Sequence, residues 1–207
     1  MSIHTVLLTM AFLSAAAYAP MARHRPSLLR TVLKTIPVAL LALVGLLSGE
    51  PLLLVAALAL SAVGDAALAQ DGDTAFTAGL GAFLIAHVAY AALFFREGRG
   101  IGEAAPWVLA LIVALAAIMG TVLVRRAGPL ALPVAAYVAA IVVMGFGAAT
   151  VGGYVLVGAA LFMASDAILG FDRFVLAHDS PTRTPAGFLV WVLYVAGQAM
   201  ILSGFIF

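Results

Sequence analysis

The chain has 207 residues, of which 65% are hydrophobic and only 9% are charged, and its mean hydropathy is +1.20. A soluble domain carries about 25% charged residues and could not hide this much apolar surface, so the composition predicts an integral membrane protein. The chain contains no cysteine, which excludes disulfides, thiolate zinc sites and cysteine nucleophiles. The net charge of +1 identifies no partner by itself, and no nucleic-acid partner is expected.

Eight apolar stretches follow one another along the chain, each close to the ~20 residues that a helix needs to cross a bilayer. Only helices satisfy their own backbone hydrogen bonds in lipid, so each stretch predicts a helix. The stretches cover residues 3–19, 31–48, 51–69, 74–95, 105–124, 130–149, 153–171 and 186–206. The predicted fold class is therefore all-α, a polytopic bundle of eight transmembrane helices that forms one domain, residues 1–207.

The first stretch ends in Ala17-Tyr18-Ala19, which resembles a signal-peptidase site. No Lys or Arg precedes the stretch, and the basic cluster follows it instead. A signal peptide has the opposite order, so we expect a first spanning helix rather than a cleaved leader.

The positive charges predict the orientation in the membrane. Eight of the ten Lys and Arg residues fall in or beside the first, third, fifth and seventh loops: Arg23, Arg25, Arg30, Lys34, Arg125, Arg126, Arg173 and Arg183. Cytoplasmic loops collect Lys and Arg, so these loops are expected in the cytoplasm and both termini outside it. The predicted location is a bacterial plasma membrane, as a multi-pass protein.

A short motif occurs twice. Gly64-Asp65-Ala66-Ala67-Leu68 and Ser165-Asp166-Ala167-Ile168-Leu169 both read small residue, Asp, Ala, apolar residue, Leu. The two aspartates are 101 positions apart, on the third and seventh predicted spans. Because four spans return a chain to the side that it left, this spacing predicts a possible parallel repeat of two four-helix halves.

Asp65 and Asp166 are the predicted catalytic residues. A carboxylate within a membrane helix costs about 2.5–3.5 kcal/mol on insertion scales, so it is a functional-site candidate by default. Two buried carboxylates that lie together do not both ionise easily, and one can keep its proton while the other is charged. Such a pair can supply an acid and a base to one reaction. It equally suits a proton-coupled transporter.

Further polar residues fall in the cytoplasmic half of the predicted spans, on several helices. Some are three or four positions apart, which places them on one helix face. Polar side chains in membrane helices face protein rather than lipid, so we expect them to line a cavity that binds the substrate. The set comprises Lys34, His87, Tyr90, Tyr137, Ser165, Tyr194 and Gln198.

Each of these residues also has a structural alternative. The two aspartates could form an ion pair with Lys34, although one lysine cannot neutralise two buried carboxylates. Lys34 could instead extend to the lipid head groups, and His87 could be a hydrogen-bonded interior histidine. Trp191 is expected to serve packing. The aspartates expected to be solvated loop charges are Asp71, Asp73, Asp172 and Asp179.

These residues together resemble the lysoplasmalogenase (YhhN) family of eight-helix membrane proteins. The resemblance covers nearly the whole chain and depends on the combination of motifs. The matching residues are Lys34 near Pro37, Gly64-Asp65, Phe83 with His87 and Tyr90, Tyr137 with Met144, Gly158-Ala159 with Phe162 and Ser165-Asp166, and Tyr194 with Gln198.

The resemblance implies an ether hydrolase that cleaves the vinyl-ether bond of a lysoplasmalogen, giving a fatty aldehyde and a glycerophospho-head-group product. Its partners would be the lysophospholipid substrate and membrane lipid. Asp65 and Asp166 fit as acid and base without assigning which is which, and Lys34 and Arg30 lie near the expected position of the phosphate. No metal or other cofactor is implied.

Two other function classes remain as alternatives. A proton-coupled transporter of a small molecule or lipid is the alternative, and it would usually have helices broken at the membrane midplane. A zinc hydrolase with three histidine ligands is not favoured. His4 is expected outside, His24 and His178 lie in predicted loops, and only His87 is inside the bundle.

Overall fold

The computed structural model describes residues 2–177 and 179–207, and within them the chain forms eight α-helices and no strand. This confirms the all-α class and the expected number of helices. The helices are α1 (Ile3–Tyr18), α2 (Leu28–Leu47), α3 (Leu52–Leu68), α4 (Asp73–Glu97), α5 (Pro106–Arg126), α6 (Ala131–Val151), α7 (Gly153–Phe174) and α8 (Arg183–Ile206).

The helix ends follow local chemistry. Helix α2 begins before the predicted residue 31 because the Ser27 hydroxyl caps it, accepting a hydrogen bond of 3.2 Å from the Arg30 amide. Pro106 begins α5, where its missing N–H would have no partner in any case. Gly152, with φ of 80°, lies between α6 and α7 and permits the turn there.

Seven of the eight helices in the described residues are long and apolar enough to cross a membrane, which makes this a multi-pass membrane protein. The remaining helix, α3, has 17 residues. At 1.5 Å per residue that is about 25 Å, at the lower end of what spans the hydrocarbon core.

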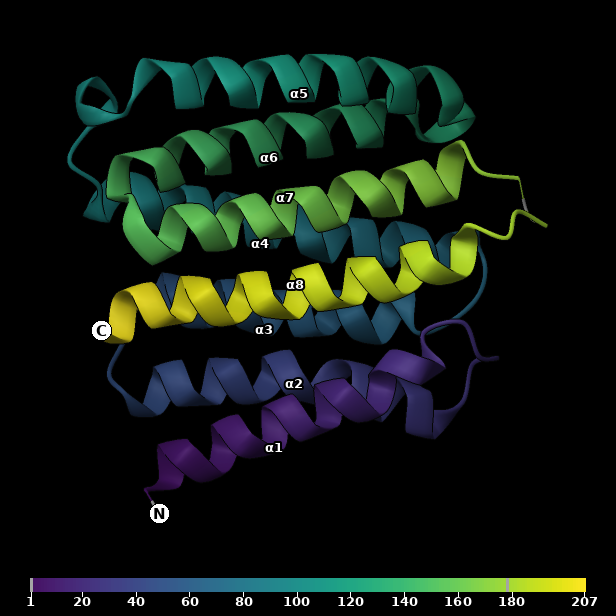
Figure 1. Ribbon diagram of the computed structural model, residues 1–207, viewed down its shortest axis with the longest axis horizontal. Helices are drawn as coiled ribbons and strands as arrows, with labels where there is room; N and C mark the ends of the chain where they lie inside the picture. Colours follow the sequence, from purple (N-terminus) through teal and green to yellow (C-terminus); the bar gives the residue numbers. More distant parts are fainter. Residues whose placement is uncertain (1, 178) are drawn as a thin grey trace.

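The helices run alongside one another (Figure 1). The loops that follow α1, α3, α5 and α7 lie at one end of the bundle, and both termini lie at the other. In this view α5 and α6 lie at one edge and α2 and α1 at the other. Between them α7 lies in front of α4, and α8 lies in front of α3. The tightest pairs are α7 with α8, α3 with α4, and α4 with α6. The contacts do not by themselves test the parallel repeat, which stays a prediction.

Glycines let the central helices approach closely near the repeated motif. A Cβ added at Gly64 would lie 2.6 Å from the Phe83 ring, and one added at Gly158 would lie 2.7 Å from the carbonyl oxygen of Gly197. Both distances are too short for a side chain, so α3 packs against α4, and α7 against α8, only because these residues are glycines.

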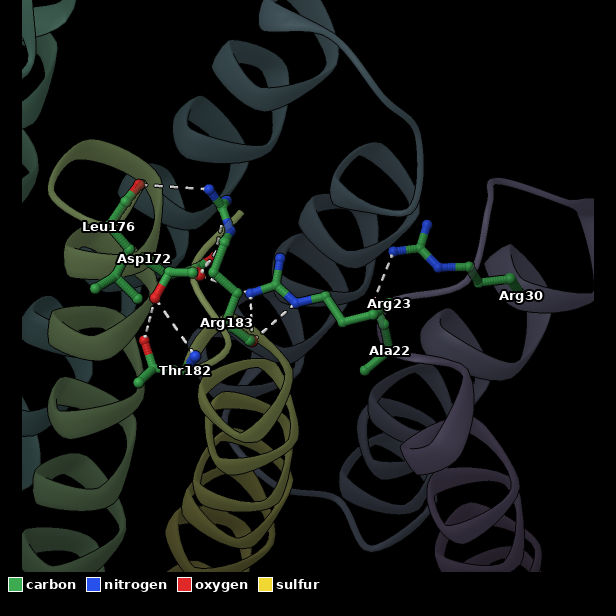
Figure 2. A network of polar contacts seen from close by, with 8 residues as sticks. Ala22, Arg23, Arg30, Asp172, Leu176, Thr182 and Arg183 are labelled. Atoms are coloured by element: carbon green, nitrogen blue, oxygen red, sulfur yellow. Dashed lines mark hydrogen bonds and ion pairs between the residues drawn. The ribbon is translucent and has the colours of Figure 1, made fainter. Parts of the chain in front are cut away.

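The polar end of the bundle is held by a network around Asp172, shown in Figure 2. Its Oδ1 lies 2.6 Å from Arg23 Nη2 and 3.3 Å from Arg183 Nε, and Asp172 is buried. The expectation of a solvated loop charge is wrong for Asp172, because α7 continues to Phe174 and carries this residue back into the bundle. Asp73 differs, since it pairs with Arg173 while remaining exposed.

Candidate active site

Asp65 lies in the last turn of α3 and is buried, with only 2% of its surface exposed. The Tyr194 hydroxyl of α8 donates a 2.6 Å hydrogen bond to its Oδ2. Lys34 of α2 places its Nζ 3.9 Å from the Oδ1. One carboxylate is therefore held by a cation from the preceding helix and a hydroxyl from the last helix.

Asp166 lies on α7, and its side chain is 7% exposed. The Tyr137 hydroxyl of α6 donates a 2.9 Å hydrogen bond to Oδ2. His87 of α4 places its Nε2 3.2 Å from the same Oδ2. Within the described residues no Lys or Arg pairs with this carboxyl group. The two aspartates thus have different partners, a lysine for one and a histidine for the other.

Two phenylalanine rings connect the surroundings of the two aspartates. The Phe162 ring centroid is 4.6 Å from that of His87 and 5.4 Å from that of Tyr194. The Phe83 ring lies 5.7 Å from Tyr194 and 6.1 Å from Phe162. The aromatic partners of the two carboxyl groups are therefore linked through the rings of Phe83 and Phe162.

An apolar cavity of about 390 Å³ lies between α5 and the helices α4, α6 and α7. Its volume falls in the range of small-molecule binding sites, about 300–1,000 Å³. On α5 its lining runs from Trp107 to Leu123, a length of about 24 Å at 1.5 Å per residue. Among the described residues that line it, Asp166 is the only charged one, and Tyr137 is the only other one with a titratable side chain.

The cavity therefore exposes one carboxyl group to an otherwise hydrocarbon-like space. Oδ2 of Asp166 is occupied by Tyr137 and His87, whereas no hydrogen bond to Oδ1 is formed within the described part of the chain. Asp65 does not line this cavity. Of the two predicted catalytic residues, only Asp166 therefore lines this cavity.

A profile of the YhhN family matches residues 29–205, most of the chain. The chain belongs to the YhhN family. It is 35% identical over 167 residues to proteins named lysoplasmalogenase from Mycobacterium bovis and Mycobacterium tuberculosis, with 74% of this chain and 60% of each relative covered. Lysoplasmalogenase TMEM86B of Homo sapiens is 35% identical over 154 residues, with 74% of this chain and 63% of the human protein covered. The chain thus spans less than two thirds of these relatives' length, and no solved structure matches it.

Of the seven binding residues predicted for this YhhN protein, only Tyr137 lines this cavity, and the other six do not: Lys34, His87, Tyr90, Ser165, Tyr194 and Gln198. Tyr90 and Gln198 are fully buried and bond to each other, the Tyr90 hydroxyl donating to Gln198 Oε1 at 2.5 Å. The Ser165 hydroxyl donates to the carbonyl of Val190, at 2.9 Å, and so links α7 to α8. None of these three residues bonds to either aspartate within the described residues, so their geometry supports helix packing.

Two other residues have structural roles. Trp191 packs as expected, donating a 2.9 Å hydrogen bond from its indole N–H to the carbonyl of Ala15. Arg30 is buried and donates to the carbonyls of Ala69 and Ala22, tying the first loop to the end of α3. Its N–H groups are therefore partly used by the backbone, which weakens its expected role at a phosphate.

The described residues contain no group of three His, Cys, Asp or Glu side chains that could hold a metal ion. His178, which the zinc alternative considered, lies outside the described residues. The apolar cavity residues of α5 are the part of the site that sequence reasoning missed. They carry no signal that separates them from lipid-facing residues, because both kinds are apolar.

Proposed function

We propose that this protein hydrolyses the vinyl-ether bond of lysoplasmalogens, releasing a fatty aldehyde and a glycerophospho-head-group product. The observation that carries the proposal is the apolar cavity with Asp166 as its charged residue. A single hydrocarbon chain fits such a space, and the vinyl ether is the first reactive bond of that chain. The relatives named lysoplasmalogenase support the same substrate class.

The chemistry requires a proton donor beside an alkenyl carbon. A protonated carboxyl group transfers its proton to the outer vinyl carbon, and the π electrons form the new C–H bond. The ether oxygen then shares its lone pair with the inner carbon, which gives an oxocarbenium ion. A carboxylate nearby stabilises this cation, as in glycoside cleavage. Water adds to the cation and returns a proton to the site, and the hemiacetal collapses to aldehyde and alcohol.

Asp65 and Asp166 are proposed to supply the acid and the base for these steps, which typically contribute about 10²–10⁴-fold each. Tyr137 orients Asp166, and Tyr194 and Lys34 hold Asp65. Lys34 retains 13% side-chain exposure near the basic end of the bundle, where the phosphate of an inner-leaflet lipid would lie. All eight helices are proposed to span the membrane, with both termini extracytoplasmic.

The transporter alternative has less support. Transporters of this kind usually carry helices that are broken at the midplane. Here α2 continues through Pro37, and the other helices that hold site residues are continuous over the described residues.

The test compares two substrates on purified protein in lipid nanodiscs. A lysoplasmalogen should yield fatty aldehyde with time, and the matched ester lysolipid should yield neither aldehyde nor free fatty acid. Asp166→Asn should abolish aldehyde release while leaving the protein monodisperse. Wild-type protein that releases no aldehyde, or that cleaves the ester equally well, would overturn the proposal.

A further inference from the structure

His87 is fully buried and is fixed from both sides of its ring. Its Nδ1 lies 2.7 Å from the carbonyl oxygen of Phe83, one turn earlier on α4. A carbonyl oxygen only accepts hydrogen bonds, so Nδ1 must carry the hydrogen. In the neutral ring, Nε2 then carries a lone pair and no hydrogen.

That lone pair faces a carboxyl group. Nε2 lies 3.2 Å from Asp166 Oδ2 and has no hydrogen-bond partner elsewhere in the described chain. An ionised Asp166 beside a neutral His87 would set two lone pairs against each other at a ring with no exposed surface, which is unfavourable for both groups. A single proton removes the conflict, on the carboxyl oxygen or on the ring.

We propose that His87 and Asp166 share one proton, that Asp166 delivers this proton to the substrate, and that His87 is the positioning residue that keeps it there. The assignment depends on the proposed vinyl-ether hydrolysis for its substrate. It makes Asp166 the acid and Asp65 the second carboxylate of the site, a division that the sequence leaves open.

The groups around the pair agree with this division. Tyr137 of α6 faces the pair with a hydroxyl that donates to Asp166, and α5 contributes no titratable side chain to the cavity. Asp65 of α3 has Lys34 of α2 and Tyr194 of α8 as its own partners. The lysine is thus paired with Asp65, and no Lys or Arg within the described residues pairs with Asp166.

The proton balance follows from this arrangement. With a proton on Asp166, transfer to the outer vinyl carbon leaves a neutral imidazole and a carboxylate, whose negative charge faces the new oxocarbenium ion. Water attack on that ion releases one proton, which returns to the pair. The pair therefore ends each turnover with the proton count with which it began. His87 has no exposed surface, so exchange with the cavity passes through Asp166.

The first experiment counts the proton without using activity. Nitrogen-15 NMR of histidine-labelled protein reports the charge of the His87 ring, assigned by its loss in His87→Asn. Infrared spectra report the carboxyl band of Asp166, assigned by its loss in Asp166→Asn. We expect, at neutral pH, either an imidazolium with a carboxylate or a neutral ring with a carboxylic acid. A neutral ring beside an ionised Asp166 would overturn the proposal, even if the protein hydrolyses lysoplasmalogen.

The second experiment uses the pH profile of aldehyde release. His87→Asn keeps an amide N–H near the Nδ1 position, able to bond to the Phe83 carbonyl, and removes the Cε1–Nε2 edge of the ring that faces Asp166. Losing that partner weakens proton binding by the pair, so the alkaline limb of kcat/KM should move to lower pH by about 1–2 units. Activity should therefore recover toward the wild-type value as the pH is lowered.

The matched control is Trp191→Phe, which also removes a buried hydrogen bond, from the indole N–H to the Ala15 carbonyl, but removes no titratable group. Its pH profile should keep the wild-type shape. A loss of activity in His87→Asn that is equal at every pH would show a structural role and would overturn the assignment. If the wild-type protein releases no aldehyde, the proposed function is refuted, whereas the shared proton is still tested by the NMR and infrared spectra.

Discussion

Neutralising each aspartate separately should cost very different amounts of stability. Asp65 is the partner of Lys34 in a buried ion pair with a separation of 3.9 Å. Asp65→Asn leaves the lysine charge buried without its counter-ion, and breaking such a pair costs about 3–5 kcal/mol. The remaining 13% exposure of the Lys34 side chain lets it reach toward the head groups, so we expect the lower end of that range.

Asp166→Asn should cost much less stability. Its partner His87 can be neutral, and the Tyr137 hydroxyl can donate to the amide oxygen of an asparagine as it does to Oδ2. One imperfect hydrogen bond is worth about 1 kcal/mol. The free energy of unfolding should thus fall by about 3 kcal/mol in Asp65→Asn and by about 1 kcal/mol or less in Asp166→Asn. Aldehyde release should nevertheless vanish in Asp166→Asn.

The assay measures thermal unfolding and aldehyde release on the same detergent preparations. For a chain of this length, 3 kcal/mol corresponds to a fall in Tm of about 6–12 °C. A double-mutant cycle tests the cause, because Lys34→Met combined with Asp65→Asn removes both charges. The double variant should be more stable than the sum of the single effects by more than about 1 kcal/mol. Additive effects, or equal destabilisation by Asp65→Asn and Asp166→Asn, would refute the reasoning.

Three further predictions follow from the cavity, the site and the loops. Ala160→Phe adds a ring to the cavity lining six residues before Asp166, so hydrolysis of long-chain substrates should fall about 10–100-fold relative to short-chain ones. The control, Val157→Phe, lies on the same helix but outside the lining and should keep the wild-type preference for chain length. Equal losses in both variants would contradict binding of the hydrocarbon chain in this cavity. Tyr137→Phe removes the hydroxyl bonded to Asp166 and should lower kcat about 2–10-fold, while an unchanged kcat would exclude an orienting role. Reporter fusions should place the loop after α7 in the cytoplasm and Phe207 outside it, and a cytoplasmic C-terminus would reverse the orientation.

The sequence predicted the helices and the polar residues of the site for one reason. A polar side chain in a membrane helix is costly, so Asp65, Asp166 and His87 stand out from an apolar background. The pairing of these residues was not predictable, because it depends on which helices are neighbours in space. Helix α4 packs beside α6 rather than α5, and this placement is what brings His87 to Asp166.

Two other features of the structure could not be predicted from the sequence, each for a different physical reason. Residues of α5 such as Leu111 and Met119 line the cavity, but an apolar residue facing a chain-shaped cavity has the same chemistry as one facing lipid. The sequence predicts a loop at Asp172 because several charged residues fall between positions 172 and 185. Its burial follows from a helix that continues to Phe174 and from two arginines that lie on other segments of the chain.

The two aspartates show how one motif can give two chemical roles. Each receives one partner from the helix before it, Lys34 of α2 for Asp65 and Tyr137 of α6 for Asp166. Each receives a second partner from the fourth helix of the other half, Tyr194 from α8 and His87 from α4. The helices that supply the partners follow the same order in the two sets, while the positions and types of the partner residues differ.

That difference in partners is the basis of the proposed division of roles. A lysine lies beside Asp65, and a buried imidazole lies beside Asp166. Because Asp166 lines the cavity and Asp65 does not, a hydrocarbon chain bound there would contact the carboxyl group that is the acid of the proposed reaction. The Asp65–Lys34 pair lies outside the cavity lining, and Tyr194, the hydroxyl partner of Asp65, packs against the rings of Phe83 and Phe162. In the proposed reaction, the negative charge that faces the cation is therefore that of Asp166.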